Sequence, residues 1–246
     1  GGASGYDTLD LSAVTGAISM ANIGHATAQN FTVATVAAGN QRSIDKVLAG
    51  SGNDTLSTAT GIAAYVDGGA GNDSITGSTG ADSLVGGAGN DTLNGASGND
   101  SINGGDGDDR IQFQTTETVD GGSGVDTLWF ATAATVDLTT ATTFAASNVE
   151  ILDLSVAANI ALTMSDVNVA AMAATSNAAI GDASYAAKQV LVVDGTNTGG
   201  DTLNLTGGQW ADTGVDTTVN GTGSFSIYKF GTTDLYVATD LNATLS

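Results

Sequence analysis

The sequence has no cysteine and no proline, and only 5% of its 246 residues are aromatic. Without cysteine, no disulfide can hold the fold together. Because large aromatic side chains are scarce, a core has to be built from Ala, Val, Leu and Ile. No run of about 18 apolar residues occurs, so we expect no membrane-spanning helix. The N-terminal residues lack the basic and apolar segments of a signal peptide, and we expect any export to use another signal.

Positive charge is also scarce. Lysine and arginine together number five, against 26 aspartates and glutamates, which gives a formal net charge of −21. Such a chain repels nucleic acids and anionic membranes and attracts cations. We therefore expect a cation as partner, and no nucleic acid.

The residues of common catalytic sites are missing as well. The chain has one histidine, His25, and contains no HExxH motif, no GxSxG motif and no cysteine nucleophile. We interpret His25 as an ordinary surface or loop residue. The only two glutamates, Glu117 and Glu150, stand in no recognisable catalytic setting. We therefore expect that this chain is not an enzyme.

Glycine and aspartate, in contrast, are abundant and periodic. Five contiguous nonapeptides fill residues 68–112, and each has Gly at its fourth position, Asp at its sixth and Ile or Leu at its eighth. Copies in the same pattern occur at 49–57 and 121–129, with weakened copies at 2–10 and 196–204. The aspartates of the five central repeats are Asp73, Asp82, Asp91, Asp100 and Asp109.

The nine-residue period predicts a glycine-rich turn followed by a very short strand. Two nonapeptides then complete one coil of a flattened solenoid, in which the aliphatic side chains of opposing strands meet inside. The fold class that we predict is all-β, a parallel β-roll or β-helix solenoid. Aspartates 18 residues apart stack in one column, roughly 5 Å from coil to coil. One column holds Asp73, Asp91 and Asp109, and the other holds Asp82 and Asp100.

These columns need a counter-ion. Residues 68–112 contain seven acidic residues, one basic residue (Arg110) and no aromatic residue, so the block has strong repulsion and a thin core. A hard cation such as Ca²⁺ takes six to eight oxygens at about 2.3–2.6 Å, and carboxylates and exposed glycine carbonyls supply them. We expect several Ca²⁺ ions, and we expect them to be required for folding. For Asp106 and Asp108 we favour solvation of the turn over ligation, with Arg110 as their charge partner.

The motif Gly-Gly-x-Gly-x-Asp-x-aliphatic-x resembles the nonapeptides of RTX (repeats-in-toxin) proteins over residues 49–129. The resemblance implies a parallel β-roll with Ca²⁺ held between the turns of successive coils. The second position departs from Gly at Ser78 and Ala96, which we expect to cost little because backbone oxygens are the ligands. The candidate ligands are Asp54, Gly69, Gly71, Asn72, Asp73, Gly80, Asp82, Gly87, Gly89, Asn90, Asp91, Gly98, Asn99, Asp100, Gly105, Gly107, Asp108, Asp109, Gly122, Gly124 and Asp126.

The flanks alternate apolar and polar residues as strands do. We expect an N-terminal β-strand module at 1–48, the calcium-binding roll at 49–129, and a C-terminal β-rich module at 130–246 with a short helix near 165–174. We interpret Trp129 and Trp210 as packing residues. The expected strands lie at 7–12, 30–36, 149–155, 188–193 and 201–207.

The residues from about 188 onward resemble the terminal region of large RTX surface proteins exported by type I machinery. The resemblance rests on DGTNTGGDTLNL and on the closing pattern IYKF and LYVATDL. It implies an uncleaved C-terminal export signal and a secreted, extracellular location at the cell surface. The expected partners are then calcium, the type I secretion machinery, and either a second copy of the chain or a cell-surface polysaccharide.

Three classes of function stay open at this point. The first is a structural surface protein of S-layer or adhesin type. The second is the carrier part of a secreted enzyme or toxin, such as a protease or lipase. The third is an ice- or sugar-binding module, which needs a flat threonine ladder or an aromatic-lined pocket.

Overall fold

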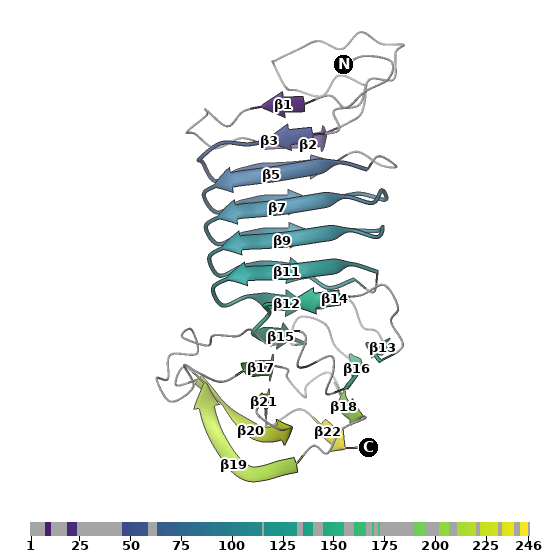
Figure 1. Cartoon of the computed structure of the whole chain (residues 1–246), viewed down its shortest axis with the longest axis vertical. Helices are drawn as coiled ribbons and strands as arrows, with labels where there is room; N and C mark the ends of the chain where they lie inside the picture. The colour runs from purple at the N-terminus through teal and green to yellow at the C-terminus, as the bar shows by residue number, and fades with distance from the viewer. Residues whose placement is uncertain are drawn as a thin grey trace.

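The computed structural model shows an all-β chain built as a tall stack of strands (Figure 1). It describes residues 8–10, 19–23, 46–58, 63–114, 116–131, 135–139, 145–154, 160–165, 169, 172, 189–194, 202–206, 211–219, 222–230, 233–238 and 242–245. Most of the described strands lie in two long sheets, whose members alternate along the chain. The predicted parallel solenoid is confirmed.

The first sheet has seven strands in the order β1-β3-β5-β7-β9-β11-β14, all paired in parallel. The strands β5, β7, β9 and β11 are the long arrows stacked in Figure 1. The bounds are β1 Thr8–Asp10, β3 Lys46–Leu48, β5 Tyr65–Ala70, β7 Ser83–Ala88, β9 Ser101–Asp106, β11 Thr118–Ser123 and β14 Ala145–Ser147.

The second sheet has eleven strands in the order β19-β20-β21-β17-β15-β12-β10-β8-β6-β4-β2. Pairing is parallel from β2 to β21, and β19, β20 and β21 end the sheet as an antiparallel meander. The bounds are β2 Ser19–Ile23, β4 Thr55–Thr58, β6 Ser74–Thr76, β8 Thr92–Asn94, β10 Arg110–Gln112, β12 Thr127–Trp129, β15 Ile151–Asp153, β17 Gln189–Asp194, β19 Ala211–Val219, β20 Thr222–Phe230 and β21 Thr233–Ala238.

A third, four-stranded parallel sheet joins segments from the C-terminal half, in the order β13-β16-β18-β22. Both long sheets also run across the boundary that we expected near residue 48, since β3 pairs with β5 and β2 pairs with β4. The bounds are β13 Thr135–Asp137, β16 Ala161–Ser165, β18 Thr202–Thr206 and β22 Asn242–Leu245.

The register confirms two nonapeptides per coil. Val66 pairs with Leu84, and Leu84 pairs with Ile102, so each coil advances by 18 residues. In the second sheet Ile75 pairs with Leu93 in the same way. The turns therefore form two edges. We call the edge after β5, β7, β9 and β11 the first edge, and the edge after β6, β8 and β10 the second edge.

Between Leu56 and Leu128, two spacings depart from nine residues, and both fall on the second edge. In a regular repeat, the core residues of two successive strands are nine positions apart. Leu56 and Val66 are ten positions apart, and Ile111 and Val119 are eight positions apart. The first edge keeps its spacing, since Val119 and Leu128 are nine residues apart. The insertion and the deletion therefore leave the first edge in register as far as Asp126. The next first-edge turn, between β14 and β15, is three residues shorter, since Ala146 and Leu152 are six residues apart.

The core is one aliphatic residue per short strand, as the eighth position of the motif predicted. The side chains of Ile75, Leu84, Leu93, Ile102 and Ile111 are exposed by 2% or less. Ile75, Leu93, Ile102 and Ile111 are flanked by polar residues that face outward, as the alternation of a half-buried strand requires, whereas Leu84 is flanked by Ser83 and Val85. The row continues beyond the repeats through Val47, Leu56, Val66, Val119, Leu128, Leu152 and Leu154.

The flanks agree with the expected strands where the structure describes them. β1, β15, β17 and β18 lie in the predicted segments, whereas 30–36 lies outside the described residues. Within 165–174 only Ser165, Val169 and Met172 are described, and the last two have helical backbone and are buried, so the short helix stays a prediction. No described helix is long and apolar enough to cross a membrane.

Candidate metal centre

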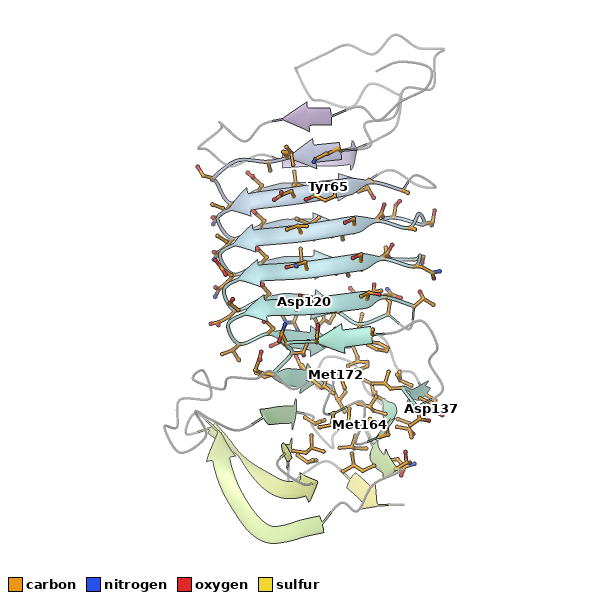
Figure 2. All side chains as sticks on the ribbon, in the orientation of Figure 1. Tyr65, Asp120, Asp137, Met164 and Met172 are labelled. Carbon is orange, nitrogen blue, oxygen red and sulfur yellow. The ribbon has the colours of Figure 1, made fainter. Side chains whose placement is uncertain are left out.

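The first edge carries a continuous ladder of carboxylates. The backbone N–H of Asp73 donates to Oδ1 of Asp91 one coil further on, at 2.7 Å, and the N–H of Asp91 donates to Oδ1 of Asp109 at 2.8 Å. At the N-terminal end of this ladder, the backbone N–H of Asp54 donates to Oδ1 of Asp73 at 2.7 Å. Below Asp109, the ladder continues through Asp126 and ends at Oε2 of Glu150. Red side-chain oxygens recur along this left edge of the stack in Figure 2.

Each central carboxylate of the ladder uses only one of its oxygens. The Oδ2 atoms of Asp73, Asp91, Asp109 and Asp126 are buried and have no hydrogen-bond partner. The four residues are exposed by 2% or less. A buried carboxylate oxygen without a partner is costly, and an ion is the usual explanation when such atoms recur. Four equivalent atoms in one column therefore indicate four equivalent cation contacts.

A glycine lies beside each of these oxygens. A Cβ atom built on Gly86 would approach both Oδ2 of Asp91 and the carbonyl oxygen of Gly104 to under 3.0 Å. One side-chain oxygen and one backbone oxygen of the next coil thus face the space that the missing side chain leaves open. Gly68 and Gly104 have the same surroundings. Carboxylate and carbonyl oxygens are the donors that Ca²⁺ prefers, so the residues fit this ion.

The second and fourth glycines of each first-edge turn have a different role. Gly87 has a φ of +117°, and Gly89 has a φ of +129°, a region that favours glycine. The carbonyl of Gly69 lies against the backbone of Gly87, so backbone oxygens stack from coil to coil. The predicted ligands that the structure brings together in these stacks are Gly69, Gly71, Gly87, Gly89, Gly105, Gly107, Gly122 and Gly124.

The second edge is shorter and less uniform. The N–H of Asp82 donates to Oδ1 of Asp100 at 2.8 Å, so the predicted column exists. Oδ2 of Asp82, however, accepts hydrogen bonds from the Ser78 N–H and the Thr58 hydroxyl. Oδ2 of Asp100 is buried without a partner. The two columns therefore differ in how many oxygens they leave for a cation.

The other residues predicted for the second edge differ from their first-edge counterparts in their surroundings. The carbonyl of Gly98 accepts a hydrogen bond from the hydroxyl of Thr116, Gly80 is only partly buried, and Asn99 is exposed. Ala96, which we expected to replace glycine at little cost, has a φ of +68°. An L-residue with a left-handed backbone destabilises the folded state by roughly 1–2 kcal/mol. The expectation that alanine replaces glycine at little cost is therefore wrong at Ala96.

The fifth positions of the first edge form an exposed second ladder. The N–H of Asn90 donates to Oδ1 of Asn72, and the N–H of Asp108 donates to Oδ1 of Asn90, both at 3.0 Å. Oδ1 of Asp108 in turn accepts the N–H of Val125. These three predicted ligands therefore tie successive turns together outside the buried carboxylates.

Arg110 was expected to balance Asp106 and Asp108, and this expectation is wrong. Its guanidinium pairs with Asp153, at 3.2 Å, and lies over the ring of Trp129 at 4.5 Å from the centroid. Arg110 starts β10, and Asp153 ends β15, two strands away in the same sheet. No repeat pattern connects residues 43 positions apart.

Sequence reasoning missed two groups of residues at the site. The first-position glycines, whose carbonyls face Oδ2, were not among the candidates, and neither were the terminal carboxylates Glu117 and Glu150. Glu117 follows Asp100 by 17 residues, the interval that also separates Asp126 from Asp109, so the spacing could have suggested it. Among the described residues, no three acidic, His or Cys side chains form a metal-binding group, so backbone oxygens are indispensable.

Burial dominates the electrostatics of the ladder. Desolvation raises the pKa of Asp91, Asp109 and Asp126 to about 7, and repulsion between neighbouring carboxylates adds to the rise. Burial also raises the pKa of Glu150 to about 7. The N–H donors of the ladder oppose these shifts without cancelling them. Without a cation, the folded chain therefore favours protonated carboxylates below about pH 7.

The raised pKa values predict how pH acts on the metal-free chain. Their ordinary values lie near 4, so between pH 4 and pH 7 the folded state holds more protons than the unfolded state. Stability without metal must then fall as pH rises through this window. We expect more β-structure in EDTA at pH 5.5 than at pH 8 by circular dichroism. In calcium, the midpoint of folding should instead shift to higher calcium below pH 7, because protons compete. Equal spectra at both pH values in EDTA would contradict this account.

The ladder also predicts unequal effects of two aspartate substitutions. Asp91→Ala removes an orphaned Oδ2 in the middle of the ladder, whereas Asp106→Ala removes an exposed carboxylate. We expect Asp91→Ala to raise the calcium midpoint of folding by about tenfold or more, the loss typical of altered metal surroundings. Asp106→Ala, which changes the charge equally, should leave the midpoint nearly unchanged. Equal shifts in a calcium titration would show that the ladder is not where the cation binds.

The comparison with known families agrees with this geometry. The RTX calcium-binding nonapeptide repeat matches the chain in four copies, over residues 43–62, 65–93 and 86–112. No curated protein matches the chain. The matched segments include Asp54, Asp73, Asp91 and Asp109, four successive members of the first-edge ladder. The roll described above is therefore an array of RTX calcium-binding nonapeptide repeats.

Proposed function

We propose that this chain is part of an extracellular structural protein, of S-layer or adhesin type, which calcium orders at the cell surface. The observation that carries the proposal is the continuity of the stack. The eleven-stranded sheet runs through the repeats and on through β12, β15, β17 and β21 without a break in pairing. Calcium bound at the turns would then stiffen the repeats and the strands that follow them as one long rod. A structural surface protein needs such rigidity, whereas a flexible spacer does not.

The chemistry of the turns supports export before folding. Extracellular calcium modules bind in the range of about 10⁻⁴–10⁻³ M, far above the calcium concentration inside cells. In the cytosol the orphaned carboxylates would have no counter-ion, and the chain would stay unfolded for the type I machinery. Outside the cell, calcium would bind and the roll would form. We also propose that the chain has no catalytic activity of its own.

Charge and sheet edges support self-association as the surface function. A net charge of −21 keeps copies apart until cations neutralise it. Among the described strands, the two long sheets end at β1 and β14, and at β2 and β19. Unpaired edges are templates for further strands. Calcium would therefore act twice, first in folding and then in association, with the second step at higher calcium.

Light scattering during a calcium titration tests this proposal, with circular dichroism followed in parallel. We expect the β signal to appear first and association to follow at higher calcium. Magnesium should not replace calcium, because it demands octahedral geometry and keeps its water. A folded chain that stays monomeric through 10 mM calcium, roughly ten times the weakest expected dissociation constant, would contradict self-association. That result would favour a carrier domain of a secreted enzyme or toxin, or binding to a surface polysaccharide.

A further inference from the structure

We propose that Glu117 closes the second carboxylate column with a calcium site of its own, formed with Asp100 beside Gly95. This site lies where the glycine and aspartate pattern of the nonapeptides has ended. The inference rests on calcium binding by the repeats and is independent of the proposed surface role.

The carboxylate of Glu117 is the most conspicuous unpartnered group in the described part of the chain. Glu117 is fully buried, and neither of its carboxylate oxygens accepts a hydrogen bond of normal geometry; the backbone of Gln114 makes only a weaker contact with the carboxylate. Its partner in the column, Asp100, also has a buried Oδ2 without a hydrogen bond. Three orphaned carboxylate oxygens therefore come from two residues that follow each other in the same column.

These oxygens converge beside a glycine. A Cβ atom built on Gly95 would lie 2.6 Å from Oε1 of Glu117 and would approach Oδ2 of Asp100 to under 3.0 Å. In the coil before, the corresponding pair beside Gly77 is Oδ2 of Asp82 and the carbonyl of Gly95. Glu117 thus supplies a charged oxygen where the regular cradle has a neutral backbone carbonyl.

The one-residue deletion explains why a glutamate takes this place. The segment between Ile111 and Val119 is one residue shorter than a regular repeat and contains no glycine. The three atoms nearest to a Cβ built on Gly95 all belong to the side chains of Asp100 and Glu117, and none is a carbonyl oxygen of this segment. The longer side chain of Glu117, which directly precedes β11, reaches the same space.

Electrostatic repulsion favours a bound cation over two neighbouring carboxylates without a counter-ion. Two buried carboxylates that face one point repel each other, and no described Lys or Arg side chain forms an ion pair with either. A divalent ion neutralises both at once and supplies a partner to all three oxygens. The competing arrangement is a single proton shared between Glu117 and Asp100, which would need no metal.

Calcium stoichiometry separates these two arrangements. The ions bound per chain are counted by equilibrium dialysis at saturating calcium and pH 7.5, for the full chain and for Glu117→Gln and Asp106→Asn. Both substitutions remove one negative charge, but only Glu117 is buried at the column end. We expect Glu117→Gln to lose one ion, or to bind it at least tenfold more weakly, and Asp106→Asn to keep the full count. An unchanged count and affinity in Glu117→Gln would overturn the inference and favour the shared proton.

A second variant decides the case if Glu117→Gln does not fold in calcium. Glu117→Asp keeps the carboxylate and shortens its reach by one methylene, so we expect a folded chain in which one ion binds more weakly. An unchanged titration of Glu117→Asp would overturn the inference. Failure of the unsubstituted chain to bind any calcium would contradict calcium binding by the repeats as a whole, a result distinguishable from either variant.

Discussion

The structure depends on carboxylate oxygens that are buried, stacked and left without partners from the protein. Asp73, Asp91, Asp109 and Asp126 each accept the N–H of the coil before with one carboxylate oxygen. The other oxygen of each lies beside a glycine and has no hydrogen-bond partner. The thin aliphatic row inside the roll cannot offset repeated buried charge on its own. We therefore propose that calcium is an integral part of the folded state.

This constraint explains the sequence of the turn. A first-position side chain would occupy the space between the two oxygens, and a second-position side chain would strike the carbonyl of the preceding coil. It also explains where irregularity is tolerated. Within the repeats, the insertion and the deletion occur on the second edge, where Asp82 has hydrogen-bond partners from Ser78 and Thr58. The first edge keeps its nine-residue spacing through Asp126, and only the turn that carries Glu150 is shorter.

The nine-residue period was sufficient to predict the coil length, the two columns and the buried row, because all three repeat with the chain. It could not predict features that arise where the period breaks. Glu117 and Glu150 enter the columns after irregular intervals, and neither has the glycine context of the motif. Arg110 finds Asp153 only because β12 and β15 follow β10 in the sheet. Backbone strain at Ala96 requires coordinates, since the local sequence resembles its neighbours.

The central claim is that the roll does not form at neutral or higher pH without calcium. Far-ultraviolet circular dichroism at pH 8, in EDTA and then in millimolar calcium, tests it most directly, with magnesium as the control. The account predicts a disordered spectrum in EDTA and in magnesium, and a β spectrum once calcium is added. A β spectrum that is unchanged in EDTA would contradict it, because the stacked carboxylates would then be stable without a counter-ion.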